Sequence, residues 1–197
     1  MIADTVIIHP GVELGDNVTI EDFCIIGAPF KGSDGVKTII GDNAVIRSHT
    51  VIYAGNVIGQ NFQTGNKANI RELNEIGDDV SIGTLSVVEH HVKIASGSRI
   101  HTQVFIPEYS ELKQDAWIGP NVVFTNARFP RSPDVKDELT GPTIGINAKV
   151  GANSTLLPGV QIGDNTLIGA GSLVTKDIPE GVVAAGQPAK VIREMDY

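Results

Sequence analysis

Four polar side chains stand at intervals of eighteen residues along the chain: Glu72, His90, Glu108 and Asn126. A carboxylate or an imidazole can take up a proton near neutral pH, and an amide can position a reacting group by hydrogen bonding. These residues can act together only if every interval of eighteen returns the chain to the same place. The elements that position them must therefore repeat with a period that divides eighteen.

Aliphatic residues recur every six positions through most of the sequence. The longest run without a slip extends from Ile40 to Phe124, and Thr64 is its only member that is not hydrophobic. The same frame holds from Ile2 to Ile26 and from Ile144 to Val174. A small or β-branched residue usually follows four positions later, and Gly with Asp or Asn often comes directly after the aliphatic, as in IGDNAV and IGDNTL.

A period of six fits neither an α-helix nor a free-standing hairpin. It indicates a coil with flat faces, in which each hexad supplies a short strand and then a tight corner. Gly, Asn and Asp tolerate the left-handed dihedral angles of such a corner. The large aliphatic fills the interior, and a solenoid of this kind buries its core only when neighbouring coils stack.

The repeat resembles that of the hexapeptide-repeat acyltransferases. The resemblance implies an all-β fold, a left-handed parallel β-helix with three hexads in each triangular coil, against the usual right-handed crossover rule. About 26 hexads then give about nine coils, and strands ~4.8 Å apart would stack them into one prism. We expect a single domain over residues 1–197, with an extended loop at 126–143, a shorter insertion at 28–39 and a short C-terminal tail.

In this frame Ala54, Glu72, His90, Glu108 and Asn126 form one outward column, with neighbours ~4.8 Å apart. The column could bind an amino sugar, with Glu108 or His90 taking up its proton. For Glu72 and His90 a solvent-facing row of polar side chains remains the alternative. Asn126 is the strongest candidate because it also stands where the repeat stops.

The C-terminal stretch IGDNTLIGAGSLVTKDIPEGVVAAGQPAKVIRE resembles the end of the galactoside and maltose acetyltransferases. That resemblance implies acetyl-CoA as co-substrate and a homotrimer with sites between subunits, in which the loop of one coil reaches over the site. The positions it assigns to coenzyme A are Ala152, Ala170, Thr175, Lys176 and Arg193. Cationic Lys176 and Arg193 can pair with phosphates, and small Ala side chains let a pantetheine lie close.

The loop itself distinguishes two kinds of acceptor. Sugar O-acetyltransferases of the family carry His-Pro at its base, and that His is the general base, whereas this chain reads ARFP, with Arg128 and Phe129. The pattern FTN-x-x-x-PR, with Asn126 and Arg131, is instead similar to N-acetyltransferases of nucleotide-linked 3-amino sugars. Asn126 would then accept a hydrogen bond from the amine. Arg128 and Arg131 would bind the anionic substrate, unless they only form ion pairs with loop carboxylates.

Two further alternatives stay open. An O-acetyltransferase of a sugar or small alcohol could use His101 as base, although a corner His bonded to a backbone carbonyl explains that residue equally well. A non-catalytic β-helix scaffold is a third possibility, since a fold does not fix a function. The histidine spacing differs from that of the γ-class carbonic anhydrases, which share the fold, so no metal is expected.

Composition narrows the partners. The net charge of -8 argues against nucleic acid or an anionic membrane as the main partner. The single cysteine, Cys24, offers neither a disulfide nor a metal-binding pair, which fits a reducing compartment. No apolar run approaches the roughly 20 residues of a spanning helix, and the N-terminus lacks the features of a signal peptide. We therefore expect a cytoplasmic enzyme.

Overall fold

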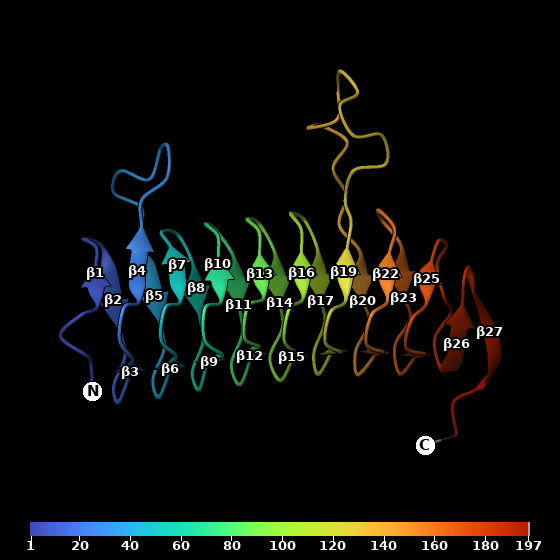
Figure 1. Cartoon of the computed structure of the whole chain (residues 1–197), viewed down its shortest axis with the longest axis horizontal. Helices are drawn as coiled ribbons and strands as arrows, with labels where there is room; N and C mark the ends of the chain where they lie inside the picture. Colours follow the sequence, from blue (N-terminus) through green and yellow to red (C-terminus); the bar gives the residue numbers. More distant parts are fainter. Residues whose placement is uncertain (197) are drawn as a thin grey trace.

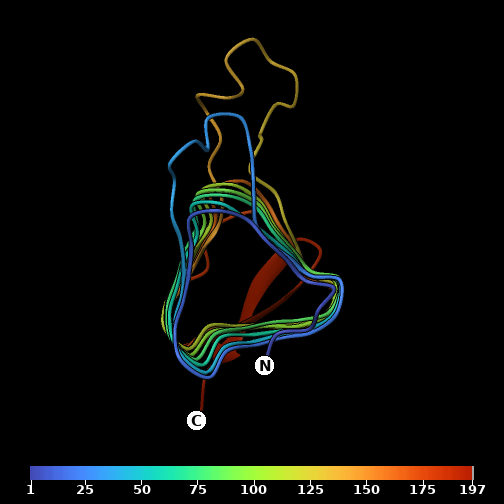
Figure 2. The same cartoon turned by 90° about the vertical axis from the view of Figure 1, so that its left-hand side faces the viewer.

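The chain forms a triangular prism of stacked coils in a computed structural model that describes residues 1–196 (Figures 1 and 2). Each face of the prism is one parallel sheet, and from β1 to β25 successive strands along the chain belong to successive faces. Within residues 1–196 only the last strand, which shares its sheet with the strand before it, runs antiparallel to its neighbour. Within the described residues no helix is long and apolar enough to cross a membrane.

The three sheets differ in strand number. The nine-stranded sheet contains β1 (Ile7–Ile8), β4 (Ile25–Ala28), β7 (Val51–Tyr53), β10 (Asn69–Ile70), β13 (Val87–Val88), β16 (Phe105–Ile106), β19 (Val123–Phe124), β22 (Thr155–Leu156) and β25 (Leu173–Val174). The eight-stranded sheet contains β2 (Val12–Leu14), β5 (Thr38–Ile40), β8 (Val57–Ile58), β11 (Glu75–Ile76), β14 (Lys93–Ile94), β17 (Glu111–Leu112), β20 (Thr143–Ile144) and β23 (Gln161–Ile162). The ten-stranded sheet contains β3 (Thr19–Ile20), β6 (Val45–Ile46), β9 (Gln63–Thr64), β12 (Ser81–Ile82), β15 (Arg99–Ile100), β18 (Trp117–Ile118), β21 (Lys149–Val150), β24 (Leu167–Ile168), β26 (Val182–Gly186) and β27 (Ala189–Glu194).

The predicted period sets the register between coils. Asn69 pairs with Val51 on one side and with Val87 on the other, so each step between strands is eighteen residues. The aliphatic of every hexad from Ile40 to Phe124 is at most 4% exposed. Burying each Ile contributes about 1.5–3 kcal/mol relative to leaving it in water, which makes this interior row the main source of stability.

Thr64, the one polar member of the row, is satisfied inside the prism. Its Oγ1 accepts a hydrogen bond from the backbone N–H of Arg47 at 2.9 Å and lies 3.2 Å from Oγ1 of Thr50. A buried hydroxyl is tolerated when it is hydrogen-bonded. The break in the aliphatic pattern is therefore compensated locally.

The residues at the corners of the coils differ in part from the Gly, Asn and Asp that the sequence pattern predicts there. We call the passage from the nine- to the eight-stranded sheet edge 1, from the eight- to the ten-stranded sheet edge 2, and from the ten- to the nine-stranded sheet edge 3. At edge 2 the left-handed residues are Asn, Asp or Gly, and the Asn and Asp side chains form a ladder, as in Asn43–Asn61–Asp79. At edges 1 and 3 bulky residues such as Leu73, Leu85 and Tyr109 also take positive φ, because coil stacking overrides local preference.

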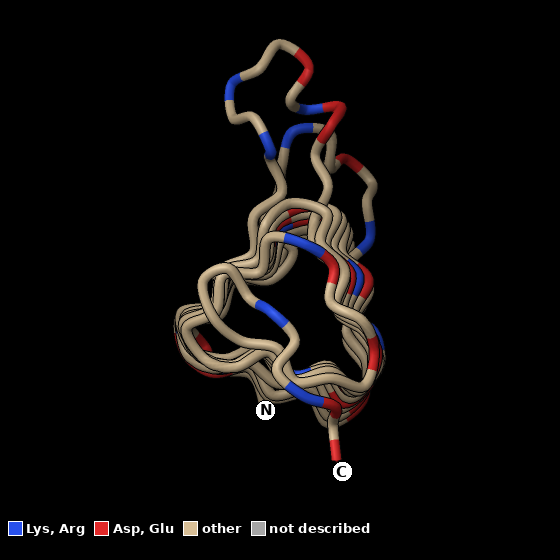
Figure 3. Tube along the Cα trace, turned by 90° about the vertical axis from the view of Figure 1, so that its right-hand side faces the viewer, with Lys and Arg blue, Asp and Glu red and all other residues tan. Residues whose placement is uncertain are grey.

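Two excursions leave the prism at edge 1 and project to the same side (Figures 1 and 2). The shorter lies between β4 and β5, and the longer, which we call the arm, comprises residues 125–142 between β19 and β20. The arm rejoins the next coil without disturbing the stack, because β17 pairs in register with β20. Both excursions carry Lys or Arg as well as Asp or Glu (Figure 3).

The outer faces differ in character. The outward residues of the nine-stranded sheet are mainly apolar: Ile7, Ile25, Val51, Asn69, Val87, Phe105, Val123, Thr155 and Leu173. Those of the eight-stranded sheet include charged residues: Glu13, Ile39, Val57, Glu75, Lys93, Glu111, Thr143 and Gln161. The nine-stranded face is therefore the one whose exposure to water is least favourable.

Candidate active site

The polar column lies at edge 1, where strands of the nine-stranded sheet end. Glu72, His90, Glu108 and Asn126 each stand two residues after the buried aliphatic of β10, β13, β16 and β19. Because these strands pair in register, the four side chains stack from coil to coil. The column thus ends at Asn126, at the base of the arm.

Asn126 and Glu108 are directly bonded. Nδ2 of Asn126 donates to Oε2 of Glu108 at 2.7 Å. This contact fixes which side of the Asn126 amide faces the carboxylate, because only the NH₂ group can donate. The amide oxygen of Asn126 is left able to accept a hydrogen bond from a ligand.

His90 continues the column on the other side of Glu108. Its Nε2 lies 3.5 Å from Oε1 of Glu108, and its Nδ1 lies 2.8 Å from Nδ1 of His91. The ring of Tyr109 is 5.7 Å from that of His91 and 6.2 Å from that of His90, measured between centroids. The carboxylate of Glu108 is therefore shared between an amide and an imidazole.

The end of the column away from the arm is buried and does not form the solvent-facing row that was the alternative for Glu72. Ala54 is only 6% exposed and Glu72 only 8%. Glu72 is bonded by Nε of Arg71 at 2.9 Å, and the guanidinium of Arg71 also lies over the ring of Tyr53. Burial is the largest single effect on Glu72 and opposes its ionisation, but the Arg71 hydrogen bond, a backbone hydrogen bond and the charges of Arg71 and His90 together outweigh it, and the pKa of Glu72 is lowered.

Glu89, His91, Arg71 and Tyr109 belong to this cluster but were not among the residues expected from sequence. Burial raises the pKa of Glu89, against the attraction of Arg71, whose Nη1 lies 3.4 Å from its carboxylate. These residues occupy the columns immediately before and after the predicted one. Applying the same eighteen-residue spacing to those columns would have found them.

The arm residues lie apart from this cluster. Arg128, Phe129 and Arg131 are all exposed, and Arg131 has a positive φ of 68°. Within residues 1–196 neither arginine forms an ion pair with a carboxylate of the arm, so the structure does not contain the self-paired loop that was one alternative. The arm is tied to the site through its base, where the backbone N–H of Thr140 donates to the carbonyl of Asn126 at 3.0 Å.

His101 stands on a different edge. It follows β15 at edge 3, and its ring centroid lies 4.7 Å from a ring of Trp117, whereas Asn126 and Glu108 lie at edge 1. Among the described residues Nε2 of His101 is buried without a partner, so the side chain makes no bond to a backbone carbonyl through that atom. Burial, with a smaller effect of Arg99, lowers the pKa of His101 and favours the neutral ring. It borders a groove of about 250 Å³ with Gln63 and Arg99.

The five residues assigned to coenzyme A also divide between edges. Ala152 and Ala170 follow β21 and β24 at edge 3, while Thr175 and Lys176 follow β25 at edge 1, and Lys176 lies in the column of Asn126. Ala170 and Lys176 are exposed. Arg193 lies on β27, paired with Val183 on the ten-stranded sheet, and its Nη1 bonds Asp196 at 2.9 Å.

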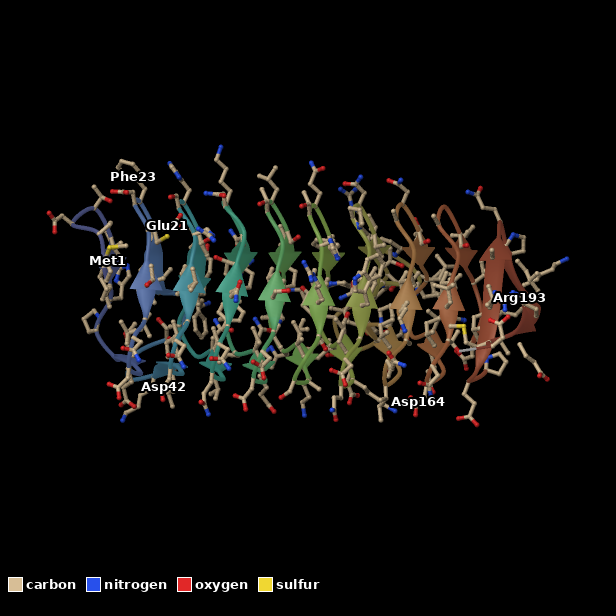
Figure 4. All side chains as sticks on the ribbon, turned by 90° about the horizontal axis from the view of Figure 1, so that it is seen from below. Met1, Glu21, Phe23, Asp42, Asp164 and Arg193 are labelled. Carbon is tan, nitrogen blue, oxygen red and sulfur yellow. The ribbon has the colours of Figure 1, made fainter. Side chains whose placement is uncertain are left out.

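Figure 4 shows the ten-stranded sheet from the side opposite the two excursions. Glu21 and Phe23 mark edge 3 along one margin, Asp42 and Asp164 mark edge 2 along the other, and Arg193 lies near the C-terminal end. A single chain therefore brings Asn126, Glu108 and His90 together but separates them from His101, Ala152, Ala170 and Arg193. The glycines beside the two alanines have a structural role: a Cβ on Gly151 would lie 2.5 Å from the backbone nitrogen of Ala170.

Comparison with known proteins agrees with the repeat. Residues 141–176 match the family model described as bacterial transferase hexapeptide (six repeats). The bifunctional protein GlmU of Listeria welshimeri serovar 6b is 30% identical over 196 residues, covering 100% of this chain and 40% of that protein. The chain thus spans less than half the length of this relative. YJL218W of Saccharomyces cerevisiae, whose name assigns it provisionally as an acetyltransferase, is 36% identical over 127 residues, covering 61% of this chain and 59% of that protein.

A solved structure supports the fold in the same way. LpxA of Bacteroides fragilis, a UDP-N-acetylglucosamine acyltransferase, aligns with a TM-score of 0.63 at 20% identity, covering 98% of this chain and 74% of that one. At that identity the likeness concerns the fold alone. It confirms the predicted left-handed parallel β-helix, and with the repeat and the family match it leads to one conclusion. Residues 141–176 carry the repeat of the bacterial transferase hexapeptide family, and the chain as a whole has the left-handed parallel β-helix fold.

Proposed function

We propose that the protein is an acetyl-CoA-dependent N-acetyltransferase that acylates the amine of a nucleotide-linked amino sugar in cytoplasmic surface-polysaccharide biosynthesis. The observation that carries the proposal is the Asn126–Glu108 pair, 2.7 Å apart at the base of the arm, where Arg128 and Phe129 replace a general-base His. The match of residues 141–176 to a transferase family model supports the acyl-transfer chemistry. A neutral amine is a good nucleophile, so such an enzyme needs positioning more than a strong base.

The proposed reaction uses the two residues differently. Oδ1 of Asn126 accepts an N–H of the acceptor amine and aims its lone pair at the thioester carbonyl. The N–C bond forms, and the ammonium proton of the tetrahedral intermediate passes to the Glu108–His90 pair. The C–S bond then breaks, and the thiolate of coenzyme A takes up a proton. Arg128 and Arg131, exposed on the arm, supply positive charge for the diphosphate or a sugar carboxylate.

The division of candidate residues between edges 1 and 3 supports a site formed by two chains. Both edges border the nine-stranded face, whose outward row is mainly apolar. In a homotrimer with this face turned toward a three-fold axis parallel to the prism, edge 1 of each chain meets edge 3 of the next. Asn126, Thr175 and Lys176 of one chain would then face Ala152, Ala170 and His101 of another across a groove that holds acetyl-CoA.

A second candidate function has one observation in its favour. His101 presents a nitrogen with no partner in the described residues, and its lowered pKa keeps the ring neutral, as a general base requires. An O-acetyltransferase of a sugar or small alcohol could use it from the neighbouring edge 3. A non-catalytic scaffold would use none of these residues.

Two assays separate these functions. Isothermal titration calorimetry with acetyl-CoA tests both enzyme functions. If no binding is measured at millimolar concentration, the non-catalytic scaffold is the only one of the three functions that remains. Release of free thiol is then measured with UDP- and dTDP-linked amino sugars and with the matching sugars that carry a hydroxyl in place of the amine. Turnover of the amine alone supports the proposal, while turnover of the hydroxyl sugar would replace it with O-acetylation.

A further inference from the structure

His91 extends the Asn126–Glu108–His90 series by one more residue. The contacts are 2.7 Å from Asn126 to Glu108, 3.5 Å from Glu108 to His90, and 2.8 Å from His90 to His91. We propose that His90 and His91 form a proton relay that carries the proton released by the acceptor amine from Glu108 to solvent. The proposal rests on the proposed N-acetyltransferase function and deepens it.

The series ends at an exposed residue, as a relay to solvent requires. The side chains of Glu108 and His90 are similarly half-buried, 24% and 27% exposed, and His91 is exposed. His91 occupies the outermost corner position of its coil, with φ of 55°, and Tyr109 occupies the same position one coil later. The Tyr109 ring, tilted by 32° against His91, holds that imidazole beside His90.

The contact between the two imidazoles requires one hydrogen between their Nδ1 atoms. Two Nδ1 atoms 2.8 Å apart share one hydrogen, so one ring donates through Nδ1 and the other accepts. The outer ends of the pair are then the two Nε2 atoms. Nε2 of His90 faces Glu108, and Nε2 of His91 is the remaining end of the path.

The proposed transfer balances at each step. Before catalysis Glu108 is a carboxylate, His90 carries its proton on Nδ1, and His91 carries its proton on Nε2. The ammonium of the tetrahedral intermediate gives its proton to Glu108, which passes a proton to Nε2 of His90. His90 then gives its Nδ1 proton to Nδ1 of His91, and His91 releases its Nε2 proton to water. Each ring is again neutral, and both return to the first tautomer by exchange with solvent.

The charged groups around His90 suit a passing cation. Glu72, which is bonded to Arg71, faces it from one neighbouring coil, Glu108 and Tyr109 from the other, and Glu89 from its own coil. The carboxylate of Glu72 is held ionised by Arg71, since its pKa is lowered. A transient imidazolium at His90 is therefore formed among carboxylates with a single guanidinium beside them.

The test uses His91→Gln and, as a matched control, His49→Gln. His49 is likewise an exposed corner histidine with positive φ, 64°, beside an aromatic ring, Phe23, but it stands at edge 3 near the N-terminal coils. With an amino-sugar acceptor we expect His91→Gln to lower kcat on the order of tenfold, less than the loss of a direct general base. Added imidazole should restore the rate, the KM for acetyl-CoA should not change, and His49→Gln should behave as the wild type.

The outcomes separate the relay from the function on which it rests. A wild-type protein that acetylates an amine while His91→Gln keeps the same kcat and pH profile removes the relay alone. A wild-type protein that acetylates no amine removes the proposed function and the relay with it. Nitrogen-15 NMR of the rings adds a readout besides activity: one Nδ1 carrying a proton and the other not supports the relay, and two Nε2–H tautomers without a shared proton overturn it.

Discussion

Asn126 donates its amide hydrogen to Glu108, eighteen residues earlier in the chain, across a distance of 2.7 Å. The two residues come from neighbouring coils of one sheet, β19 and β16, so their separation is set by strand pairing and not by the flexible arm. The bond gives the candidate site a fixed acceptor atom, Oδ1 of Asn126. The predictions below begin from this pair.

Replacing Asn126 by Ala should lower kcat/KM for the amine acceptor on the order of 10²-fold, because positioning of the nucleophile is lost. Asn126→Asp should be similarly impaired, since a carboxylate beside Glu108 adds repulsion where the amide donated. Steady-state kinetics at fixed acetyl-CoA measure the effect. Glu111→Gln, on the outward row of the eight-stranded sheet, is the control. An unchanged kcat/KM in Asn126→Ala would remove Asn126 from the reaction.

Self-association should depend on the nine-stranded face. Val87→Asp puts a charge in the middle of its apolar outward row and should convert a trimer into monomers without activity. Val57→Asp makes the same change on the eight-stranded face, where Val57 is 50% exposed, and should leave the trimer intact. Light scattering after gel filtration measures both masses. A trimer that survives Val87→Asp but not Val57→Asp would place the interface on the other face.

His101 should make the protein less stable in acid. Its pKa in the folded chain lies below its ordinary value of 6.5, owing first to burial and then to Arg99. The unfolded chain therefore binds the proton more readily, and the stability from a neutral His101 is present above pH 6.5 and is lost as pH falls through the folded value. We expect a smaller drop in Tm between pH 7.5 and pH 5.5 in His101→Gln than in the wild type. Equal drops in Tm for the two proteins would show that His101 does not contribute to the loss of stability in acid.

Lys176 should contribute to acetyl-CoA binding through its charge. The side chain is exposed in the column of Asn126 and forms no ion pair within residues 1–196. Lys176→Ala should raise the Kd for acetyl-CoA roughly tenfold, the range of one charge-assisted hydrogen bond to a phosphate. The difference should shrink as salt increases. Lys113→Ala, an exposed lysine at edge 2, is the matched control, and equal effects of the two variants would argue against a specific phosphate contact.

Thr64→Val should destabilise the fold although it adds apolar surface. The change removes the acceptor of the Arg47 backbone N–H and one of the two partners of Thr50, whose Oγ1 also donates to the carbonyl of Gly65 at 3.3 Å. An Arg47 N–H left unpaired costs about 1–3 kcal/mol. Ile82, which pairs with Thr64 in the sheet, provides the comparison: Ile82→Val should cost about 0.5–1.5 kcal/mol through lost volume alone. Urea unfolding measures both. A Thr64→Val variant as stable as the wild type would mean that the hydroxyl contributes nothing.

Much of the architecture followed from the sequence because the repeat is rigid. Once Ile40 to Phe124 fall six apart without a slip, every residue between them is assigned to a face and to a coil, and the pairing of Asn69 with Val87 confirms that assignment. The same rule predicts that Glu108 stacks under Asn126. It could not show whether the nitrogen or the oxygen of the Asn126 amide faces Glu108, or which nitrogen of His90 does, since that depends on side-chain rotamers.

The parts that sequence did not predict depend on corners and on partners. Leu73 and Tyr109 adopt positive φ against their own preference, so a rule based on Gly, Asn and Asp located only some of the corners. His91 was missed as a site residue because its contact with His90 crosses a corner and not a strand pair. His101 was expected as the base of an alternative O-acetyltransferase, and the structure separates it from Asn126 by the width of the nine-stranded sheet, so within one site only a second chain could bring the two together.

The arm leaves edge 1 after Asn126 and closes where Thr140 bonds back to Asn126, while β17 and β20 pair as if nothing stood between them. The position of each residue in the prism therefore depends on the number of residues that precede it within the coils. One residue added inside a coil would rotate every later side chain to a different face, whereas residues added within the arm would rotate none. Insertions can thus change the length of the arm and the ligand that it contacts without altering the prism. The distance from Asn126 to Lys176, in contrast, can change only if a whole coil is gained or lost.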